Sequence, residues 1–335
     1  MIKKQNYLKH AIVLFLLLLL MQPERAWAAY ENVEFSSLTN HDGLTNSQVG
    51  AILKDTRGYI WFGTQSGLCR FDGFRMKTFY YINTDDKSLP NNSVDELQQD
   101  YGGNIWVHTS VGYCIYKYDE EQFERKPEEW LKNIHVQGPP YKLLIDKDKN
   151  MWIAVYGQGL YYHNAKTKNT YLFKFTKKAQ PGCLKEGNIS KITEVDGDAL
   201  ITYGDGTICR VNGQKQKVLW YNSFLATHKA AGDNGAYTFY DGIGGFWLSV
   251  SNANYVYQSK TGKWTDARSY LTNMGIDIPC PTRILMRDIA RDKAGNLWVA
   301  SDHNGLFFVD FKRKICRQYV HSEAKGSIVD NSLQK

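Results

Sequence analysis

One stretch, DTRGYIWFGTQSGLCRFD at residues 55–72, places a tryptophan between two glycine-containing turns and two short apolar segments. The pattern returns along the chain, for example as DYGGNIWVHTS at residues 100–110. Successive copies are separated by 45, 46, 48, 47 and 51 residues. Their anchor positions are Trp61, Trp106, Trp152, Leu200, Trp247 and Trp298, the fourth belonging to a degenerate copy. A sequence that repeats at this spacing is a repeat architecture, and the repeat determines the fold.

Each copy reads as four short strands joined by tight turns. The D-x-x-G element is typical of a turn in which aspartate accepts backbone hydrogen bonds and glycine takes a left-handed conformation. Four antiparallel strands in a unit of about 45 residues are the signature of a β-propeller blade, whose two apolar faces need neighbouring blades. We therefore predict an all-β propeller with six complete blades.

The recurring anchor residues have two interpretations. Aromatic side chains dominate core area, so a tryptophan at the same position of each blade is expected between adjacent blades; ligand stacking is the alternative. We assign the six anchors to the structural core between blades.

The ends of the chain resemble the link between the first two copies. Residues 35–49 align with the link at 79–94, and YVHSEAKGSIVDNSLQK repeats it at residues 319–335. This predicts partial strands of a seventh blade at both ends and a chain that stops within a propeller, since about 30 further residues would complete that blade. A closed ring of six blades is the alternative.

The first 28 residues are predicted to be a cleaved signal peptide. Lysines precede an apolar run, AIVLFLLLLLM, and Ala26 and Ala28 supply small residues before the cut. The run is shorter than the roughly 20 apolar residues of a membrane span, although an uncleaved anchor remains the alternative. The propeller is assigned to residues 29–335, and the exported chain is expected in the periplasm.

Charge and cysteine content exclude several functions. Residues 1–28 contain four of the basic residues and one acidic residue, so their removal lowers the net charge from +7 to +4. This mild excess gives nucleic-acid binding no support. The cysteines form no C-x-x-C pair, and the histidines no H-x-H or H-x-x-x-H pair, so we predict no metal site and no cofactor. Cys69 and Cys114 hold equivalent positions in neighbouring copies and are expected to remain unbonded.

The copies resemble the two-component regulator propeller repeat, found in the periplasmic sensor regions of hybrid two-component histidine kinases of Bacteroidetes. The run LTNHDGLTNSQVGAILKDTRGYIWFGTQSGLCRFDG at 38–73 is similar to the opening of such a sensor. The resemblance implies an inner-membrane parent protein that senses an oligosaccharide and regulates genes for glycan use, with a homodimer of the full-length sensor left open. It implies no catalytic residue in this chain, because the kinase and receiver parts of the family have no counterpart here.

The repeat also allows two other classes of function. A propeller glycosidase or lyase would need carboxylates outside the repeat frame that face one pocket, whereas Asp55, Asp100, Asp146 and Asp292 share one repeat position. A secreted scaffold that binds a protein partner suits the same fold, and only the resemblance separates it from a sensor.

Ligand binding is expected on the turn that follows the anchor strand, because this turn varies between copies. Amides, hydroxyls and aromatic rings there suit a sugar, whereas the alternative is that exposed turns vary freely. The candidate ligand-binding residues are Gln65, Ser110, Tyr156, Tyr203, Asn252 and His303.

Overall fold

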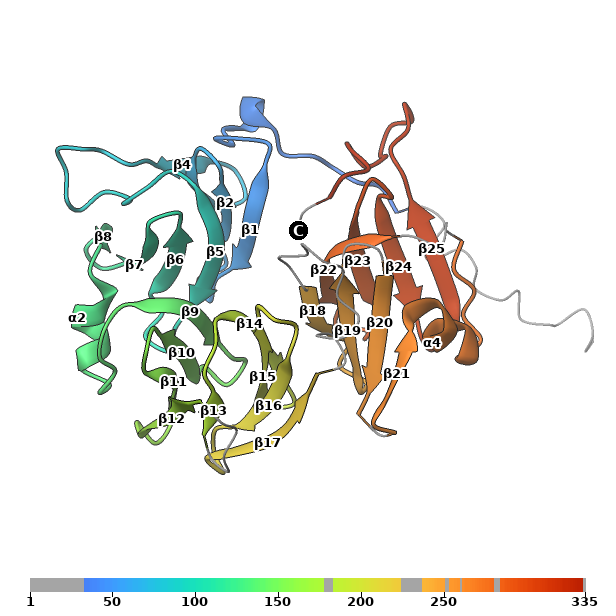
Figure 1. Cartoon of the computed structure of the whole chain (residues 1–335). Helices are drawn as coiled ribbons and strands as arrows, with labels where there is room; N and C mark the ends of the chain where they lie inside the picture. Colours follow the sequence, from blue (N-terminus) through green and yellow to red (C-terminus); the bar gives the residue numbers. More distant parts are fainter. Residues whose placement is uncertain are drawn as a thin grey trace, which may run out of the picture.

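The fold consists of six antiparallel sheets arranged in a ring, as the computed structural model of the chain shows (Figure 1). The predicted all-β propeller of six four-stranded blades is therefore confirmed. The structure describes residues 33–177, 183–223, 237–250, 253–259, 261–279 and 284–333. The predicted signal peptide and Asn252 lie outside these ranges.

Each blade runs in sequence order from an inner to an outer strand. The first three blades are β1 (Val49–Lys54), β2 (Ile60–Thr64), β3 (Gly67–Phe71) and β4 (Met76–Phe79); β5 (Val94–Gln99), β6 (Ile105–Thr109), β7 (Gly112–Lys117) and β8 (Gln122–Glu124); and β9 (Pro140–Ile145), β10 (Met151–Val155), β11 (Gly159–His163) and β12 (Thr170–Thr176). A short parallel strand, β13 (Leu184–Lys185), extends blade three at its outer edge.

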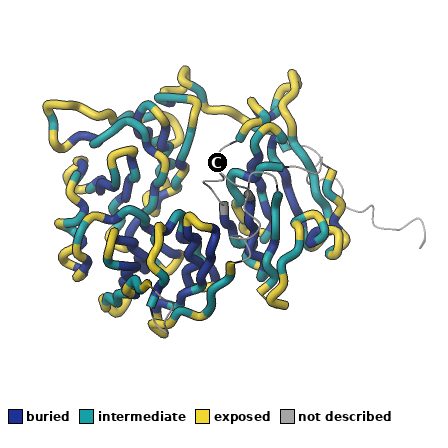
Figure 2. Tube along the Cα trace, viewed as in Figure 1, coloured by how far each residue is buried: buried dark blue, intermediate teal, exposed yellow. Residues whose placement is uncertain are grey.

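The other three blades follow the same order. They are β14 (Ile189–Val195), β15 (Asp198–Tyr203), β16 (Ile208–Asn212) and β17 (Lys217–Asn222); β18 (Tyr237–Tyr240), β19 (Gly245–Val250), β20 (Ala253–Gln258) and β21 (Lys263–Asp266); and β22 (Leu285–Arg291), β23 (Leu297–Asp302), β24 (Leu306–Asp310) and β25 (Ile315–Tyr319). Buried residues concentrate in the strands and exposed residues in the connections (Figure 2).

The turn between the first two strands of a blade is built by its aspartate. In blade two, Asp100 Oδ1 accepts hydrogen bonds from the backbone N–H groups of Gly102 and Asn104, at 2.8 and 3.0 Å. Gly103 follows with a φ of 85°, a conformation that costs glycine little because it has no Cβ. The sequence therefore predicted this turn correctly, down to the left-handed glycine.

The anchor residues lie on the second strand of each blade, and the first five pack toward the next blade. Trp61 is fully buried and meets Tyr116 of blade two at 5.2 Å between ring centroids. Leu200 is also fully buried, while Trp298 of blade six is only partly buried and stacks on Tyr319 of its own blade. The first five anchors thus fill the seams between neighbouring sheets, whereas Trp298 stacks within blade six.

The expected partial strands of a seventh blade are not present in the described residues. Residues 33–48 and 320–333 carry no strand; the first segment contains only a 3-10 helix, η1 (Asn40–Asp42). Instead the two ends meet, since the Phe35 N–H donates to the Gly326 carbonyl at 2.8 Å. Figure 1 shows this N-terminal segment, in blue, running from blade six to blade one. The C-terminal segment also contacts blade six, since the Leu333 N–H donates to the Ser301 carbonyl of β23 at 2.9 Å, but these isolated bonds do not form a ladder.

Two short helices, which the sequence analysis did not predict, fill the links after blades two and five. They are α2 (Pro127–Lys132) and α4 (Ala267–Asn273). Both helices end with the same backbone hydrogen bond. The Val136 N–H donates to the Leu131 carbonyl after α2, and the Ile276 N–H donates to the Leu271 carbonyl after α4. In the sequence, WLKNIHV at residues 130–136 corresponds to YLTNMGI at 270–276. The propeller therefore carries a second repeat, three blades apart.

Candidate functional site

The inner strands share an irregularity at the face of the ring that carries the variable turns. In five blades, the pairing of the inner strand with its neighbour shifts by one residue near the start of the inner strand. Such a β-bulge redirects a side chain and is over-represented next to binding sites. The residues skipped by the register are Gly50, Asp95, Tyr141, Ser190 and Arg287. The bulges thus place four different side chains at equivalent points of one face.

In blade two the bulge residue pairs with a histidine. His108 Nδ1 lies 2.5 Å from Asp95 Oδ1. Burial alone would raise the pKa of Asp95, but the hydrogen bond and charge of His108, together with the charge of Lys142, lower it below its ordinary value. Asp95 is therefore a carboxylate at neutral pH.

In blade three the bulge residue carries an aromatic pair. Tyr141 stacks on Tyr156, with ring centroids 3.9 Å apart and an interplanar angle of 17°. Tyr156 follows β10 and is 68% exposed, whereas Tyr141 is partly buried. The partly buried ring of Tyr141 packs against one face of the Tyr156 ring, so the other face of Tyr156 is open to solvent.

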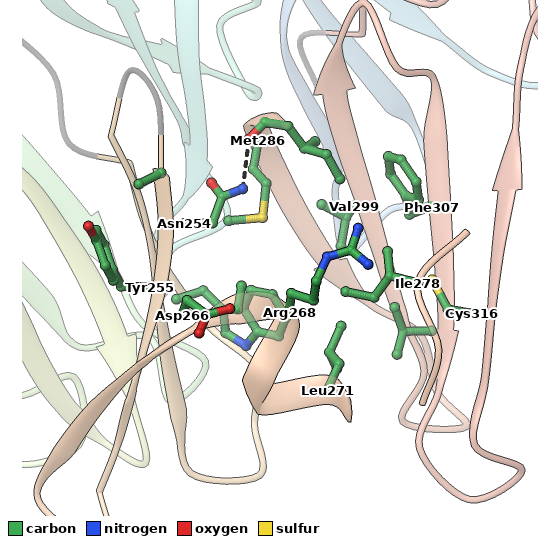
Figure 3. Close-up of a pocket in the computed structure, with 15 residues that line it drawn as sticks. Asn254, Tyr255, Asp266, Arg268, Leu271, Ile278, Met286, Val299, Phe307 and Cys316 are labelled. Carbon is green, nitrogen blue, oxygen red and sulfur yellow. Dashed lines mark hydrogen bonds between the residues drawn. The ribbon is translucent and has the colours of Figure 1, made fainter. Parts of the chain in front are cut away.

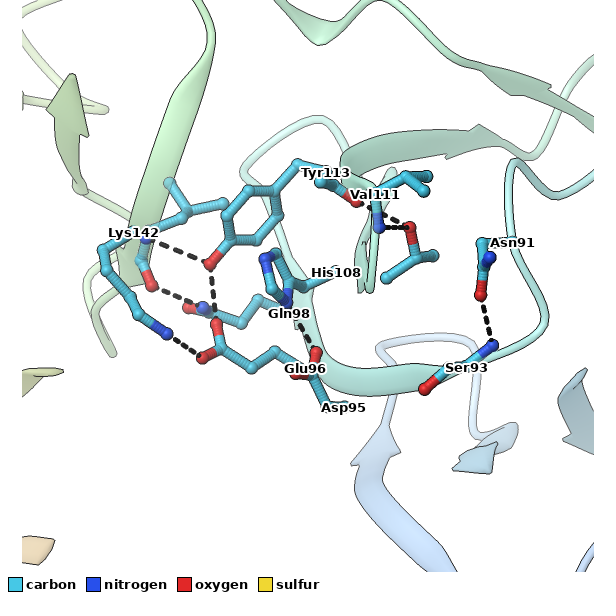
Figure 4. Close-up of polar contacts among 12 residues, drawn as sticks. Asn91, Ser93, Asp95, Glu96, Gln98, His108, Val111, Tyr113 and Lys142 are labelled. Atoms are coloured by element: carbon cyan, nitrogen blue, oxygen red, sulfur yellow. Dashed lines mark hydrogen bonds and ion pairs between the residues drawn. The ribbon is translucent and has the colours of Figure 1, made fainter. Parts of the chain in front are cut away.

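A polar network joins blades two and three beside these pairs (Figure 4). The Tyr113 hydroxyl donates to Glu96 at 2.6 Å and accepts the Leu143 N–H at 3.1 Å, while Lys142 donates to Glu96 at 3.0 Å. Burial of Tyr113, reinforced by the charge of Glu96, raises its pKa well above the ordinary value. The Tyr113 hydroxyl therefore stays protonated and continues to donate to Glu96. These bonds hold the side chains of Tyr113, Glu96 and Lys142 in place.

A groove of about 590 Å³ lies on this face and spans blades two, three and four. Its volume is within the range of small-molecule sites. Its lining combines an aromatic surface with polar side chains from the bulges and turns, including His108, Tyr113, Glu128, Tyr141, Lys142, Tyr156, Asn188 and Ser190. The groove is the candidate ligand-binding site.

Arg125 fixes the link at the edge of this groove. Its guanidinium donates to the Ser88 carbonyl at 3.0 Å and to the Asp85 carbonyl and the Ser88 hydroxyl at 2.8 and 2.7 Å. It also lies over the Tyr81 ring, 5.5 Å from the centroid. The long link between blades one and two is thereby held by a residue of blade two.

Of the candidate residues predicted from the sequence, Tyr156 alone lines this groove within the described part of the chain. Gln65 is exposed and accepts the Ser93 hydroxyl at 2.9 Å, and the exposed Ser110 donates its N–H to the Ser93 carbonyl at 3.2 Å. His303 is exposed at the turn of blade six, 3.4 Å from Asp302. The structure thus spreads these residues around the face.

Tyr203 corrects an expectation. We expected it on an exposed turn, but only 2% of its surface is accessible, and it ends β15 inside the core between blades three and four. The turn of blade four begins one residue later, because Tyr203 itself accepts from Gly206 and donates to Thr207. Its ring is therefore enclosed by protein.

The sequence analysis missed His108, Tyr141 and Lys142, which line the groove, and Asp95, which pairs with His108 beside it. Each lies on a strand, and its position at the groove depends on the bulge or on the start of the inner strand. A bulge has no sequence signal that a single chain reveals, whereas variable turns can be read from the internal repeats. In the described residues, no cluster of three His, Cys, Asp or Glu side chains could hold a metal ion. Nor does any helix there have the length and apolar character needed to cross a membrane.

Comparisons with known proteins agree with the repeat. Residues 43–66 match the family described as two component regulator propeller, which confirms the predicted resemblance. Among curated proteins, none matches the sequence significantly.

Solved structures are similar over most of the chain. The extracellular domain assigned to the hybrid two component system BT3049 from B. thetaiotaomicron is 20% identical with a TM-score of 0.64, covering 91% of this chain and 39% of that one. The extracellular domain of BT4673 from the same organism, described as a one component system, is 16% identical with a TM-score of 0.55, covering 86% and 39%. This chain therefore spans about two fifths of the length of these domains, and at such identities the likeness concerns the fold.

Proposed function

We propose that this chain is the ligand-binding propeller of an exported two-component sensor and that the groove across blades two, three and four, here called the mouth groove, binds an oligosaccharide. The similarity to extracellular domains of hybrid two component systems supports the sensor part. The proposal extends to a periplasmic location, to a full-length parent with a histidine kinase that can form a homodimer, and to control of glycan-utilisation genes.

The stacked pair of Tyr141 and Tyr156 is the observation that favours an oligosaccharide as the ligand. A sugar ring offers an apolar face to an aromatic ring and hydroxyls to neighbouring donors and acceptors. Tyr156 presents such a ring, and the same groove supplies amide, hydroxyl and imidazole groups from Asn188, Ser190 and His108. A chain of sugars would extend along the groove from blade two to blade four.

Titration calorimetry of the chain against a panel of oligosaccharides tests this proposal. We expect saturable binding, and Tyr156→Ala should weaken it about ten-fold, because stacking of a ring on an aromatic side chain contributes about 1–3 kcal/mol. Phe74→Ala is the matched control, since Phe74 is 94% exposed in the β3–β4 turn outside the groove. Unchanged affinity of Tyr156→Ala would remove the groove from the proposal, and capture of a protein partner without any sugar binding would favour the scaffold function.

A further inference from the structure

The two helix-bearing seams of the propeller are equivalent in their aromatic packing. In the seam between blades two and three, Trp130 of α2 packs edge-on against Trp106, with ring centroids 5.4 Å apart. In the seam between blades five and six, Tyr270 of α4 packs edge-on against Trp247 at 5.7 Å. The two seams differ in one respect: side chains fill the seam between blades two and three, whereas the seam between blades five and six contains a cavity.

The decisive position is at the start of the third strand. Tyr113 pairs with the residue two beyond Trp106, and Asn254 pairs with the residue two beyond Trp247, so the two are structural equivalents. Tyr113 is 5% exposed and closes its seam through its ring and hydroxyl. Asn254 is much smaller, and its Nδ2 reaches only across to the Ile284 carbonyl, at 2.7 Å.

A cavity of about 220 Å³ occupies the seam where the tyrosine is missing (Figure 3). Its wall is formed mainly by apolar side chains of both blades and of α4, namely Trp247, Leu271, Met286, Val299, Phe307 and Val309. An apolar cavity of about 150 Å³ is already large enough to bind benzene. The seam therefore has room for one aromatic ring with a substituent.

Two polar groups mark the cavity. Among the described residues, the buried Asn254 Oδ1 has no hydrogen-bond partner, an arrangement that leaves an acceptor unsatisfied. Arg268, in the first turn of α4, is exposed and extends its guanidinium between the two sheets toward Val299 and Phe307 (Figure 3). Asp266 also lines the mouth, but its carboxylate caps α4 by accepting the Ser269 N–H at 2.8 Å.

We propose that the seam between blades five and six is a second binding site, for a small aromatic carboxylate that carries a hydroxyl group. The ring fills the apolar cavity, the hydroxyl donates to Asn254 Oδ1, and the carboxylate pairs with Arg268. This site lies between blades five and six, away from the groove across blades two to four. It requires no oligosaccharide, so it is independent of the proposed function.

Calorimetry and thermal unfolding of the full chain with 4-hydroxyphenylacetate test the site, with neutral 4-ethylphenol as the comparison ligand. We expect saturable binding of both and an increase of Tm with ligand concentration. Asn254→Tyr restores the residue of the equivalent seam and should weaken both ligands at least ten-fold without lowering Tm. Arg268→Gln should weaken the acid at least three-fold and leave 4-ethylphenol unchanged, and Phe74→Ala should alter neither.

Three results would overturn the proposal. Absence of binding by either probe at millimolar concentration would mean that the cavity is only a packing void. Normal binding by folded Asn254→Tyr would place the ligand elsewhere. If Asn254→Tyr does not fold, Arg268→Gln decides, because equal effects on the acid and on the neutral phenol would exclude the carboxylate pairing.

Discussion

Trp106 Nε1 donates a hydrogen bond of 3.0 Å to Asp100 Oδ2, six residues earlier in the chain. The same bond occurs in four other blades, between Trp61 and Asp55, Trp152 and Asp146, Trp247 and Asp241, and Trp298 and Asp292. One carboxylate therefore fastens the first turn of the blade to the indole that packs between blades. This explains why aspartate and tryptophan recur together at a fixed spacing.

Asp100→Ala should destabilise the protein by about 3 kcal/mol, because it leaves two turn N–H groups and the buried indole N–H without their acceptor. Asp100 is 2% exposed, so water does not replace the carboxylate readily. Urea unfolding followed by tryptophan fluorescence measures the change. Asp119→Ala, whose side chain is 99% exposed, is the control and should change stability by less than about 0.5 kcal/mol. Equal effects of the two variants would contradict the role of Asp100.

The degenerate blade shows how the chain replaces this bond. Blade four has Glu194 and Leu200 where the other blades have aspartate and tryptophan. There Asp198 accepts hydrogen bonds from Arg210 at 2.6 Å and from Asn212. These hydrogen bonds between the second and third strands thus replace the bond from the aspartate to the indole, and the sheet keeps its four strands.

Tyr156 and Tyr203 are both predicted ligand-binding residues, but they should respond differently to truncation, because Tyr203 ends β15 whereas Tyr156 follows β10. Tyr203→Ala removes a buried ring and should cost about 3–5 kcal/mol of stability. Tyr156→Ala removes an exposed ring that contacts mainly Tyr141, so the cost should be at most about 1 kcal/mol. Chemical denaturation of both variants checks this. A large loss for Tyr156→Ala would mean that its ring is structural rather than available for ligand.

These tyrosines also show which features of the site can be predicted from the sequence and which cannot. The repeat predicted the blades, the turns and the variable positions, because each depends on local spacing that recurs. Whether Tyr203 lies in the turn or in the strand depends on one residue of turn length, which a repeat with gaps does not determine. The bulge that redirects Tyr141 depends on the register between β9 and β10, and the position of Trp130 depends on packing across a seam. Neither can be read from the local spacing of residues.

Arg125→Ala should loosen the link between blades one and two without unfolding the propeller. The charged guanidinium donates to the Asp85 and Ser88 carbonyls, and hydrogen bonds to charged groups contribute about 1.5–3 kcal/mol. Loss of about 1.5 kcal/mol from local stability corresponds to roughly ten-fold faster amide exchange. Hydrogen exchange of residues 82–90 measures it, with Lys132→Ala as the control, because the Lys132 side chain is exposed on α2. Unchanged exchange in this link would show that other contacts hold it.

His163 should make stability depend on pH in the acidic range. His163 is 1% exposed; Nδ1 lies 2.9 Å from the Thr170 hydroxyl, and the buried Nε2 has no partner in the described part of the chain. Burial, together with the charges of Lys168 and His135, lowers the pKa of His163 below its ordinary value of 6.5. The unfolded chain therefore binds a proton at a higher pH than the native state, so that stability is complete above pH 6.5 and falls as the pH decreases below it.

Thermal unfolding between pH 8 and pH 5 measures this dependence. We expect Tm of the unmodified protein to fall below pH 6.5, and His163→Gln should reduce the slope because the titrating ring is absent. His41→Gln, at an exposed position in η1, should keep the slope of the parent. An identical slope in the parent and His163→Gln would assign the acid sensitivity to other groups, since only the buried imidazole is removed by that change.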